Sequence, residues 1–254
     1  MVKIAINGFG RIGRLAFRAA WEQKRALDVV AINDPAGART DALLLEFDSN
    51  YGPFPAKVES DEGSMRVDGK RIVVFRERDW SRLNWSDVGA DIVLECSGRG
   101  TSRPEAEKHL AAGAKRVLIS APGKGEDLTV VLGVNEERYD PGQHRVISNG
   151  SCTTNCLAPV AKVLLDAFGI KWGFMSTVHS YTNSQAIHDR GAEDVRESRA
   201  AALNIIPTDT GAARALVKVI PELAGRFNGM AYRVPTPTVS VIDLVAELGC
   251  DVTP

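Results

Sequence analysis

The sequence predicts an α/β protein in which a doubly wound parallel sheet is followed by an α+β domain with a mixed or antiparallel sheet. The first half alternates short β-branched runs with helical segments, a pattern typical of parallel sheets with helices on both faces. The second half has longer strand-like runs with few helical crossovers between them, which favours antiparallel or mixed pairing. We place the boundary near Asn149, with domains at 1–148 and 149–254.

The individual elements follow from these patterns in chain order. In the first half we expect strands at 3–7, 29–33, 71–75, 92–96, 116–120, 130–134 and 146–148, and helices at 11–22, 38–47 and 104–112. In the second half we expect a helix at 156–168, strands at 173–181, 229–233 and 238–248, a polar loop at 182–197 and a helix at 210–219. Thr253-Pro254 is a helix start without a helix after it. A frayed tail would also explain this ending, but we expect the second domain to be incomplete.

Composition narrows the class of protein. The 254 residues carry a formal net charge of −1, which indicates neither a nucleic acid nor an anionic membrane as partner. No apolar run is long enough to span a bilayer, and no secretory signal precedes the first strand. Four cysteines in a chain of this length do not make a disulfide framework. We expect a cytoplasmic protein with reduced thiols.

A glycine-rich turn joins the first strand to the first helix. In the run 8–13, Gly8 permits the turn, Gly10 lets the backbone approach a pyrophosphate, and Gly13 lets helix and strand pack closely. Asp34 ends the second strand, where a carboxylate binds the adenosine ribose hydroxyls. The alternative is a strand–turn–helix whose glycines are incidental, and the carboxylate after the second strand disfavours it. The context predicts a Rossmann-type dinucleotide site, and Asp34 favours NAD over NADP.

A single cysteine marks the expected chemistry. Cys152 lies between small hydroxyl and amide residues just before a helix-forming run. Free N–H groups and the positive end of the helix dipole there favour thiolate over thiol. Cys152 is therefore a candidate nucleophile.

A nucleophilic thiol needs a base, and the chain has four histidines. His179 ends a predicted strand among polar residues, which suits a catalytic imidazole better than a structural one. His109 is expected on a surface helix, and the other two in polar loops. Cys156 is expected to be a packed small hydrophobe, because no cysteine–histidine set has zinc-ligand spacing; we expect no metal.

An anion site is also indicated. Residues 208–213 place hydroxyls and a glycine at the start of a helix, which suits a phosphate as well as ordinary N-capping. Arg196, Arg199 and Arg233 are candidate phosphate clamps, although each taken alone is more often a solvated surface charge.

Four segments together resemble glyceraldehyde-3-phosphate dehydrogenase: 6–14, 148–155, 179–182 and 230–237. The resemblance implies that Cys152 attacks the aldehyde of glyceraldehyde 3-phosphate while His179 serves as base. It implies a thiohemiacetal, hydride transfer to the nicotinamide, a thioester, and release of 1,3-bisphosphoglycerate by inorganic phosphate. It also implies a homotetramer when the chain is full length.

The same resemblance assigns binding residues. Those for the attacking phosphate are Ser151, Thr153, Thr210 and Gly211, and those for the substrate's own phosphate are Thr182, Arg196 and Arg233. Beside the three glycines, the residues that line the dinucleotide pocket are Asn7, Arg11, Ile12, Asp34, Arg78, Ser97 and Ser120.

Two departures from the family pattern carry expectations. The family's chain continues with the rest of the substrate domain and a closing helix, so we expect a fragment that is inactive or weakly stable. Arg190-Gly191 stands where NAD-specific members have a Leu-Pro pair that faces the neighbouring subunit's adenosine, and an arginine there would neutralise a 2′-phosphate. We therefore expect some NADP use despite Asp34.

Two other functions stay open at this stage. One is a paralogue that acts on erythrose 4-phosphate or passes the acyl group to arsenate, since its anion pocket would look alike. The other is a nucleotide-binding or scaffold protein that kept the fold and lost catalysis.

Overall fold

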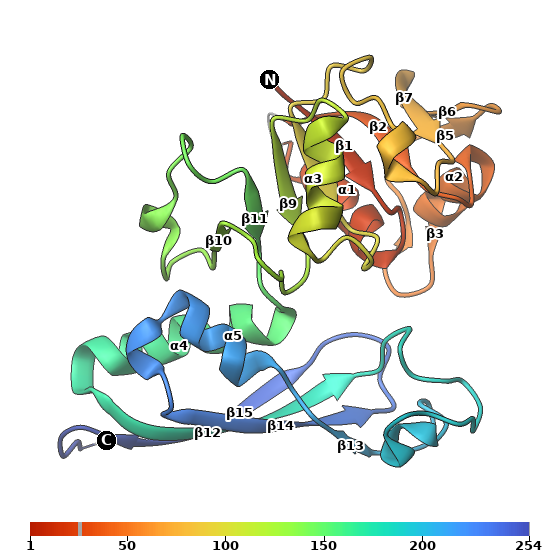
Figure 1. The fold of residues 1–254 in the computed structure, drawn as a ribbon. Helices are drawn as coiled ribbons and strands as arrows, with labels where there is room; N and C mark the ends of the chain where they lie inside the picture. Colours follow the sequence, from red (N-terminus) through yellow and green to blue (C-terminus); the bar gives the residue numbers. More distant parts are fainter. Residues whose placement is uncertain (25–26, 254) are drawn as a thin grey trace. The chain divides into compact units, whose positions relative to one another are not determined.

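The computed structural model describes residues 1–24 and 27–253 in two compact units (Figure 1). The first unit comprises residues Met1–Val130 and Arg138–Gly150, and the second comprises Val131–Glu137 and Ser151–Pro254. The division after Gly150 lies close to the expected boundary near Asn149, although residues 131–137 belong to the second unit. The limits of the functional domains stay a prediction. Pro254, part of the expected helix start, lies outside the described residues.

The described part of the first unit holds a nine-stranded sheet in the order β10-β11-β9-β8-β1-β2-β7-β6-β5. All pairings from β10 to β7 are parallel, whereas β7, β6 and β5 pair antiparallel. The strands are β1 (Val2–Asn7), β2 (Leu27–Asn33), β5 (Val58–Ser60), β6 (Ser64–Val67), β7 (Lys70–Phe75), β8 (Ile92–Glu95), β9 (Arg116–Ile119), β10 (Leu128–Thr129) and β11 (Val146–Ser148). The doubly wound parallel sheet is confirmed, and the antiparallel edge is an addition to it.

Three α-helices of the described first unit connect these strands: α1 (Arg11–Glu22), α2 (Ala38–Glu46) and α3 (Arg103–Ala111). A short pair, β3 (Phe47–Asp48) with β4 (Gly52–Pro53), follows α2. Chain order reverses at β1, which lies between β2 and β8. The carboxyl ends of these three strands therefore meet at a topological switch point, where open α/β sheets bind ligands.

The expected strand at 130–134 is wrong, because strand pairing ends at Thr129. The Val134 N–H donates to the Val131 carbonyl at 3.1 Å, and Gly133 has φ 79°, so the chain turns instead of extending. Val131 and Val134 are nevertheless buried, packed in the core of the second unit. Their apolar character serves that core.

The described second unit has a four-stranded sheet in the order β13-β14-β12-β15. These strands are β12 (Ile170–Ser180), β13 (Ile206–Thr208), β14 (Phe227–Val234) and β15 (Val241–Leu248). β12 pairs parallel with β14 and antiparallel with β15, so the expected mixed sheet is confirmed. Figure 1 shows α4 (Cys152–Phe168) and α5 (Ala212–Val219) over one face of this sheet.

Helix α4 starts four residues before the expected start at Cys156. Ser151 is its N-cap, and the Ser151 hydroxyl accepts a hydrogen bond from the Thr154 N–H at 3.0 Å. A side-chain cap of this kind satisfies a backbone donor that the first turn leaves without a partner. Cys152 is thus the first helical residue. Among the helices of the described residues, none is long and apolar enough to cross a membrane.

Candidate active site

Cys152 lies at the N-terminus of α4, as its first residue. Its side chain is exposed, and its Sγ lies 3.2 Å from His179 Nε2. This hydrogen bond lowers the pKa of Cys152 from 9.0 to about 7, against the opposing effect of partial desolvation by neighbouring groups. The position at the helix N-terminus favours the thiolate further. A large fraction of Cys152 is therefore thiolate near neutral pH.

His179 supplies the other half of this pair. It is buried, 8% exposed, near the carboxyl end of β12. Its hydrogen bond with Cys152 raises the pKa of the imidazole above 6.5, while burial lowers it. The contact brings a nucleophile and a base within proton-transfer distance.

Arg233 completes this cluster from the neighbouring strand. The parallel register of β12 and β14 pairs His179 with Arg233. Arg233 Nη1 lies 2.6 Å from His179 Nδ1 and donates to the Ser180 carbonyl at 3.0 Å. Burial lowers the pKa of Arg233 below its ordinary value. A guanidinium thus lies directly beside the imidazole of the Cys152–His179 pair.

The residues expected to bind phosphate take different positions. Thr153 is buried, with its hydroxyl 3.9 Å from Cys152 Sγ, and Ser151 caps α4 beside it. The Thr210 hydroxyl accepts from the Ala212 N–H at 3.2 Å, and Gly211 is the N-cap residue of α5. Thr210 lies one residue before the N-cap, and its hydroxyl already accepts from a backbone N–H of the first turn of α5.

Two further expected phosphate ligands contact other groups. The Arg196 guanidinium forms an ion pair with Asp194, Nη2 to Oδ2 2.6 Å, and lies 3.6 Å from Asp209. The Thr182 hydroxyl makes a hydrogen bond with Ser184 at 3.0 Å. Arg199, the third candidate clamp, pairs with Asp189. Arg233 thus contacts the Cys152–His179 pair, whereas Arg196 is ion-paired with carboxylates.

A separate pocket of about 190 Å³ lies at the switch point of the first unit. Six of the ten expected cofactor residues line it: Asn7, Gly8, Gly10, Asp34, Arg78 and Ser97. The Asp34 carboxylate accepts from the Phe9 N–H at 2.8 Å and from the Ala36 N–H at 2.9 Å. The carboxylate is thereby fixed at the wall of the pocket, as a ribose ligand requires.

The glycines show why this turn excludes side chains. Gly8 has φ 89°, and a Cβ there would lie 2.4 Å from Ser97 Cα. A Cβ on Gly13 would lie 2.2 Å from the Gly8 carbonyl oxygen. A Cβ on Gly10, by contrast, would meet nothing within 4 Å, so its backbone borders open space. Two glycines serve packing, and the third leaves room for a pyrophosphate, so the site fits a dinucleotide.

The other four expected cofactor residues do not line this pocket. Arg11 lies beside the Asn50 side chain, Ile12 is 49% exposed, and Gly13 packs α1 against the turn. The Ser120 hydroxyl donates to the Glu95 carbonyl at 3.0 Å, just after β9.

A buried polar cluster beneath the pocket was not foreseen. Glu95 is 2% exposed and accepts hydrogen bonds from Asn7 Nδ2 at 2.5 Å and the Ser97 N–H at 2.8 Å. Burial raises its pKa, but bonds from His109, Ser97 and Asn7 outweigh that effect and hold it below 4.5. The sequence signal for this cluster is Glu95, a lone acidic residue in an apolar strand. A buried acid needs hydrogen-bond partners, so its position indicates polar neighbours.

Two expectations about single residues are wrong. His109 lies not on a surface but is fully buried, 3.1 Å from Glu95 and accepting from Trp85 Nε1 at 3.2 Å. Its helix turns that face toward the Glu95 cluster. Cys156 is exposed instead of packed, because α4 begins early enough to turn position 156 outward.

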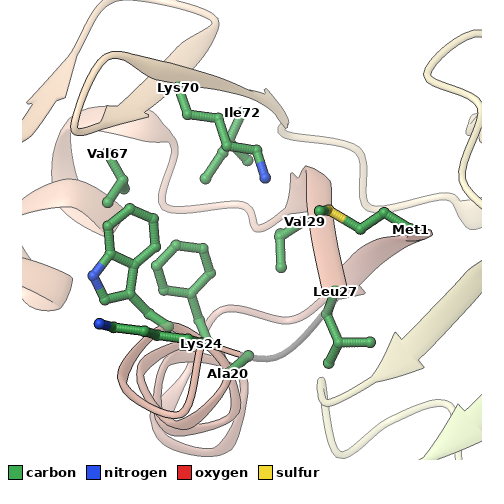
Figure 2. A pocket seen from close by; sticks show the side chains of 10 residues that line it. Met1, Ala20, Lys24, Leu27, Val29, Val67, Lys70 and Ile72 are labelled. Carbon is green, nitrogen blue, oxygen red and sulfur yellow. The ribbon is translucent and has the colours of Figure 1, made fainter.

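An apolar pocket of about 390 Å³ lies elsewhere in the first unit (Figure 2). Phe17 and Trp21 of α1, with Val29 and Ile72 of the sheet, form much of its wall. It contains none of the expected site residues, and its lining offers few polar groups to orient a dinucleotide.

Comparisons with known proteins match both halves of the chain. Residues 2–103 match the family model of the glyceraldehyde 3-phosphate dehydrogenase NAD binding domain, and residues 151–254 match that of its C-terminal domain. Glyceraldehyde-3-phosphate dehydrogenase of Geobacillus stearothermophilus is 58% identical over 252 residues, which cover 99% of this chain and 75% of that protein. Corresponding enzymes of Bacillus subtilis (strain 168) and Streptomyces coelicolor are 57% and 53% identical, with the same coverage.

Proposed function

The chain belongs to the glyceraldehyde-3-phosphate dehydrogenase family, and from that premise we propose that it oxidises glyceraldehyde 3-phosphate to 1,3-bisphosphoglycerate with a nicotinamide dinucleotide and inorganic phosphate. The observation that carries this proposal is the 3.2 Å contact between Cys152 Sγ and His179 Nε2 at the start of α4. A thiolate beside an imidazole is the arrangement that covalent catalysis on an aldehyde needs.

The chemistry begins with the Cys152 thiolate. Its sulfur attacks the aldehyde carbon, an S–C bond forms, the carbonyl π bond breaks, and His179 protonates the oxygen to give a thiohemiacetal. When bound, the nicotinamide dinucleotide accepts the hydride whose loss converts this adduct to a thioester. His179 takes the hydroxyl proton that is lost in the same oxidation. A phosphate oxygen then attacks the thioester carbonyl, and the Cys152 thiolate leaves.

We assign the dinucleotide to the pocket at the switch point. The turn at Gly8 and Gly10 accommodates the pyrophosphate, and Asp34 holds the ribose hydroxyls. Arg11, Ile12, Arg78, Ser97 and Ser120 complete the proposed set. For the anions we propose Ser151, Thr153, Thr210 and Gly211 for inorganic phosphate, and Thr182, Arg196 and Arg233 for the substrate's phosphate. To bind this phosphate, Arg196 has to break its ion pair with Asp194. We further propose a homotetramer for the full-length protein.

A direct assay tests this function. NAD reduction by glyceraldehyde 3-phosphate should require phosphate, with arsenate as an alternative acceptor, and should exceed that by erythrose 4-phosphate. Replacing Cys152→Ser should lower kcat by at least about a thousandfold while leaving NAD binding intact. The same chain extended to the length of its relatives serves as a second test protein. Full activity of the serine variant, or none in either wild-type chain, would reject the proposal.

The cofactor preference is a separate proposal. Asp34 would repel a 2′-phosphate, whereas Arg190, an exposed arginine in the polar loop, would neutralise one bound by the neighbouring subunit of the proposed tetramer. We therefore propose that NAD is preferred and that NADP is used measurably. Comparing kcat/KM for the two cofactors decides this, and Arg190→Leu should widen the preference for NAD. A preference for NAD above about a thousandfold, or 4 kcal/mol, in the wild type would contradict it.

A further inference from the structure

The Nδ1 side of His179 carries an unusual set of contacts. Nδ1 lies 2.7 Å from the Ser180 carbonyl oxygen and 2.6 Å from Arg233 Nη1. Nη1 in turn donates to the same carbonyl at 3.0 Å. His179 Nδ1 can donate or accept a hydrogen bond, the Ser180 carbonyl oxygen can only accept one, and Arg233 Nη1 can only donate one.

These contacts cannot all be favourable at once. If Nδ1 carries a proton, it donates to the Ser180 carbonyl, but Arg233 then directs a cationic N–H at another N–H. If Nδ1 carries no proton, its lone pair accepts from Arg233, which also donates to the Ser180 carbonyl; the two acceptors then lie 2.7 Å apart, and the shared Arg233 N–H offsets their repulsion. The guanidinium and a proton on Nδ1 therefore compete for one position.

Two further observations bear on Arg233. Its Nε is buried and has no hydrogen-bond partner, so the side chain has a donor free for an anion. The charged and titratable groups around the cluster are the Cys152 thiol on the Nε2 side of the ring and Glu197, which attracts Arg233 electrostatically. Arg233 is thus held at His179 without all its donors being used.

We propose that Arg233 is a positioning residue that keeps the proton of His179 on Nε2 in the free protein, and that a phosphate group bound to Arg233 draws it away and lets Nδ1 take up a proton from solvent. The second half rests on the proposed function, which places the substrate's phosphate at Arg233. The first half rests on the contacts alone.

The consequence is a substrate-dependent change in the role of His179. With Arg233 at Nδ1, the ring is neutral and its Nε2–H donates to the thiolate. With Arg233 on phosphate, the ring is an imidazolium. Its Nε2–H then protonates the aldehyde oxygen as the S–C bond forms, which leaves a neutral ring with the proton on Nδ1. Nε2 is then free to take the hydroxyl proton in the oxidation.

The proton on each ring nitrogen can be observed directly. In protein labelled with ¹⁵N-histidine, His179 is assigned by the signal lost in His179→Asn, and its two nitrogens are followed from pH 5 to 10. In the free wild type, the neutral ring should be protonated on Nε2. In Arg233→Met, the proton should move to Nδ1 and the pKa of the imidazolium should rise by about one unit or more, since a charge at this distance is removed. Arg233→Lys, which keeps the charge, should lie between the two.

The phosphate half needs a second titration. Inorganic phosphate should raise the pKa of His179 in the wild type and leave it unchanged in Arg233→Met. Lys171→Gln, which removes a charge from an exposed position on the same strand, should behave as the wild type in both titrations. Circular dichroism identifies a variant that fails to fold, and Arg233→Lys then replaces it.

Each outcome decides one half. A neutral wild-type ring protonated on Nδ1, or an Arg233→Met variant that titrates as the wild type, overturns the positioning role. No effect of phosphate on the wild type overturns the release step. Neither titration measures turnover, so a protein that passes both and oxidises no aldehyde would reject the proposed function alone.

Discussion

At the scale of single residues, the pair Cys152 and His179 forms one titrating unit, because each shifts the pKa of the other. The pKa of Cys152 is lowered to about 7 mainly by its hydrogen bond to His179, and that of His179 is raised by the same bond. The thiolate is therefore present above about pH 7 and lost as the pH falls through this value. The apparent values belong to the pair.

Alkylation of Cys152 by iodoacetamide tests this coupling. In the wild type the rate should reach half its maximum near pH 7. In His179→Asn the midpoint should move toward the ordinary value of 9.0. At pH 7 the thiolate fraction, and with it the rate, should fall by about fiftyfold, partly offset by the greater nucleophilicity of a more basic thiol. His188→Asn, a change in an exposed loop, is the control, and equal midpoints in all three proteins would contradict the coupling.

At the scale of elements, local sequence signals located most helices and strands but not all their ends. The alternation of β-branched and helical runs predicted β1, α1 and β2, because each follows its own hydrophobic period. The start of α4 was misplaced, because a serine cap followed by Cys-Thr-Thr has weak helix propensity, and packing of Leu157, Ala158 and Ala161 outweighs it. The prediction of a strand at 130–134 was wrong because apolar residues indicate burial, and a buried segment need not be a strand.

The candidate site divides in the same way. Cys152, His179, Asp34 and the glycines were recognisable, since each residue type suits its chemistry. The Arg233–His179 contact depends on the register between β12 and β14, which are separated by more than forty residues of loop and helix. The buried partnership of Glu95 and His109 depends on how α3 packs on the sheet, chiefly on β9. A local signal such as the lone acid Glu95 shows that a partner is needed, but it does not say which residue the tertiary fold supplies.

The cap of α4 links an element to the chemistry. Ser151→Ala removes the hydroxyl that accepts from the Thr154 N–H, and loss of such a cap costs about 1 kcal/mol. Hydrogen exchange of the Thr154 amide should become about fivefold faster, and the alkylation midpoint of Cys152 should rise as the first turn frays. Ser151→Thr, which keeps a capping hydroxyl, should resemble the wild type. Unchanged exchange in Ser151→Ala would show that the cap does not hold this turn.

At the scale of the whole molecule, the two units carry different tasks. The first unit holds the pocket with Gly10 and Asp34, and the second holds the Cys152–His179 pair. Each unit has its own apolar core, so each site is built on a separately packed scaffold. A substitution in the first unit can therefore weaken dinucleotide binding without changing the reactivity of the Cys152 thiol. A substitution at the thiol can likewise leave dinucleotide binding intact.

The glycine turn allows this separation to be tested in the intact chain. Gly10 has φ −69°, which other residues adopt freely, and a Cβ there meets no protein atom within 4 Å. Gly10→Ala should therefore melt at the wild-type temperature without ligand, yet its methyl group would occupy the space assigned to the pyrophosphate. In the wild type, NAD at a hundred times its Kd should add about 2.7 kcal/mol to the free energy of unfolding. Gly10→Ala should lose most of this gain and keep the alkylation midpoint of Cys152. Gly63→Ala, where a Cβ also meets nothing within 4 Å, is the matched control and should gain as the wild type does. If Gly10→Ala and the wild type gained equally from NAD, the dinucleotide would bind outside this turn, and the apolar pocket at Trp21 would be the next place to examine.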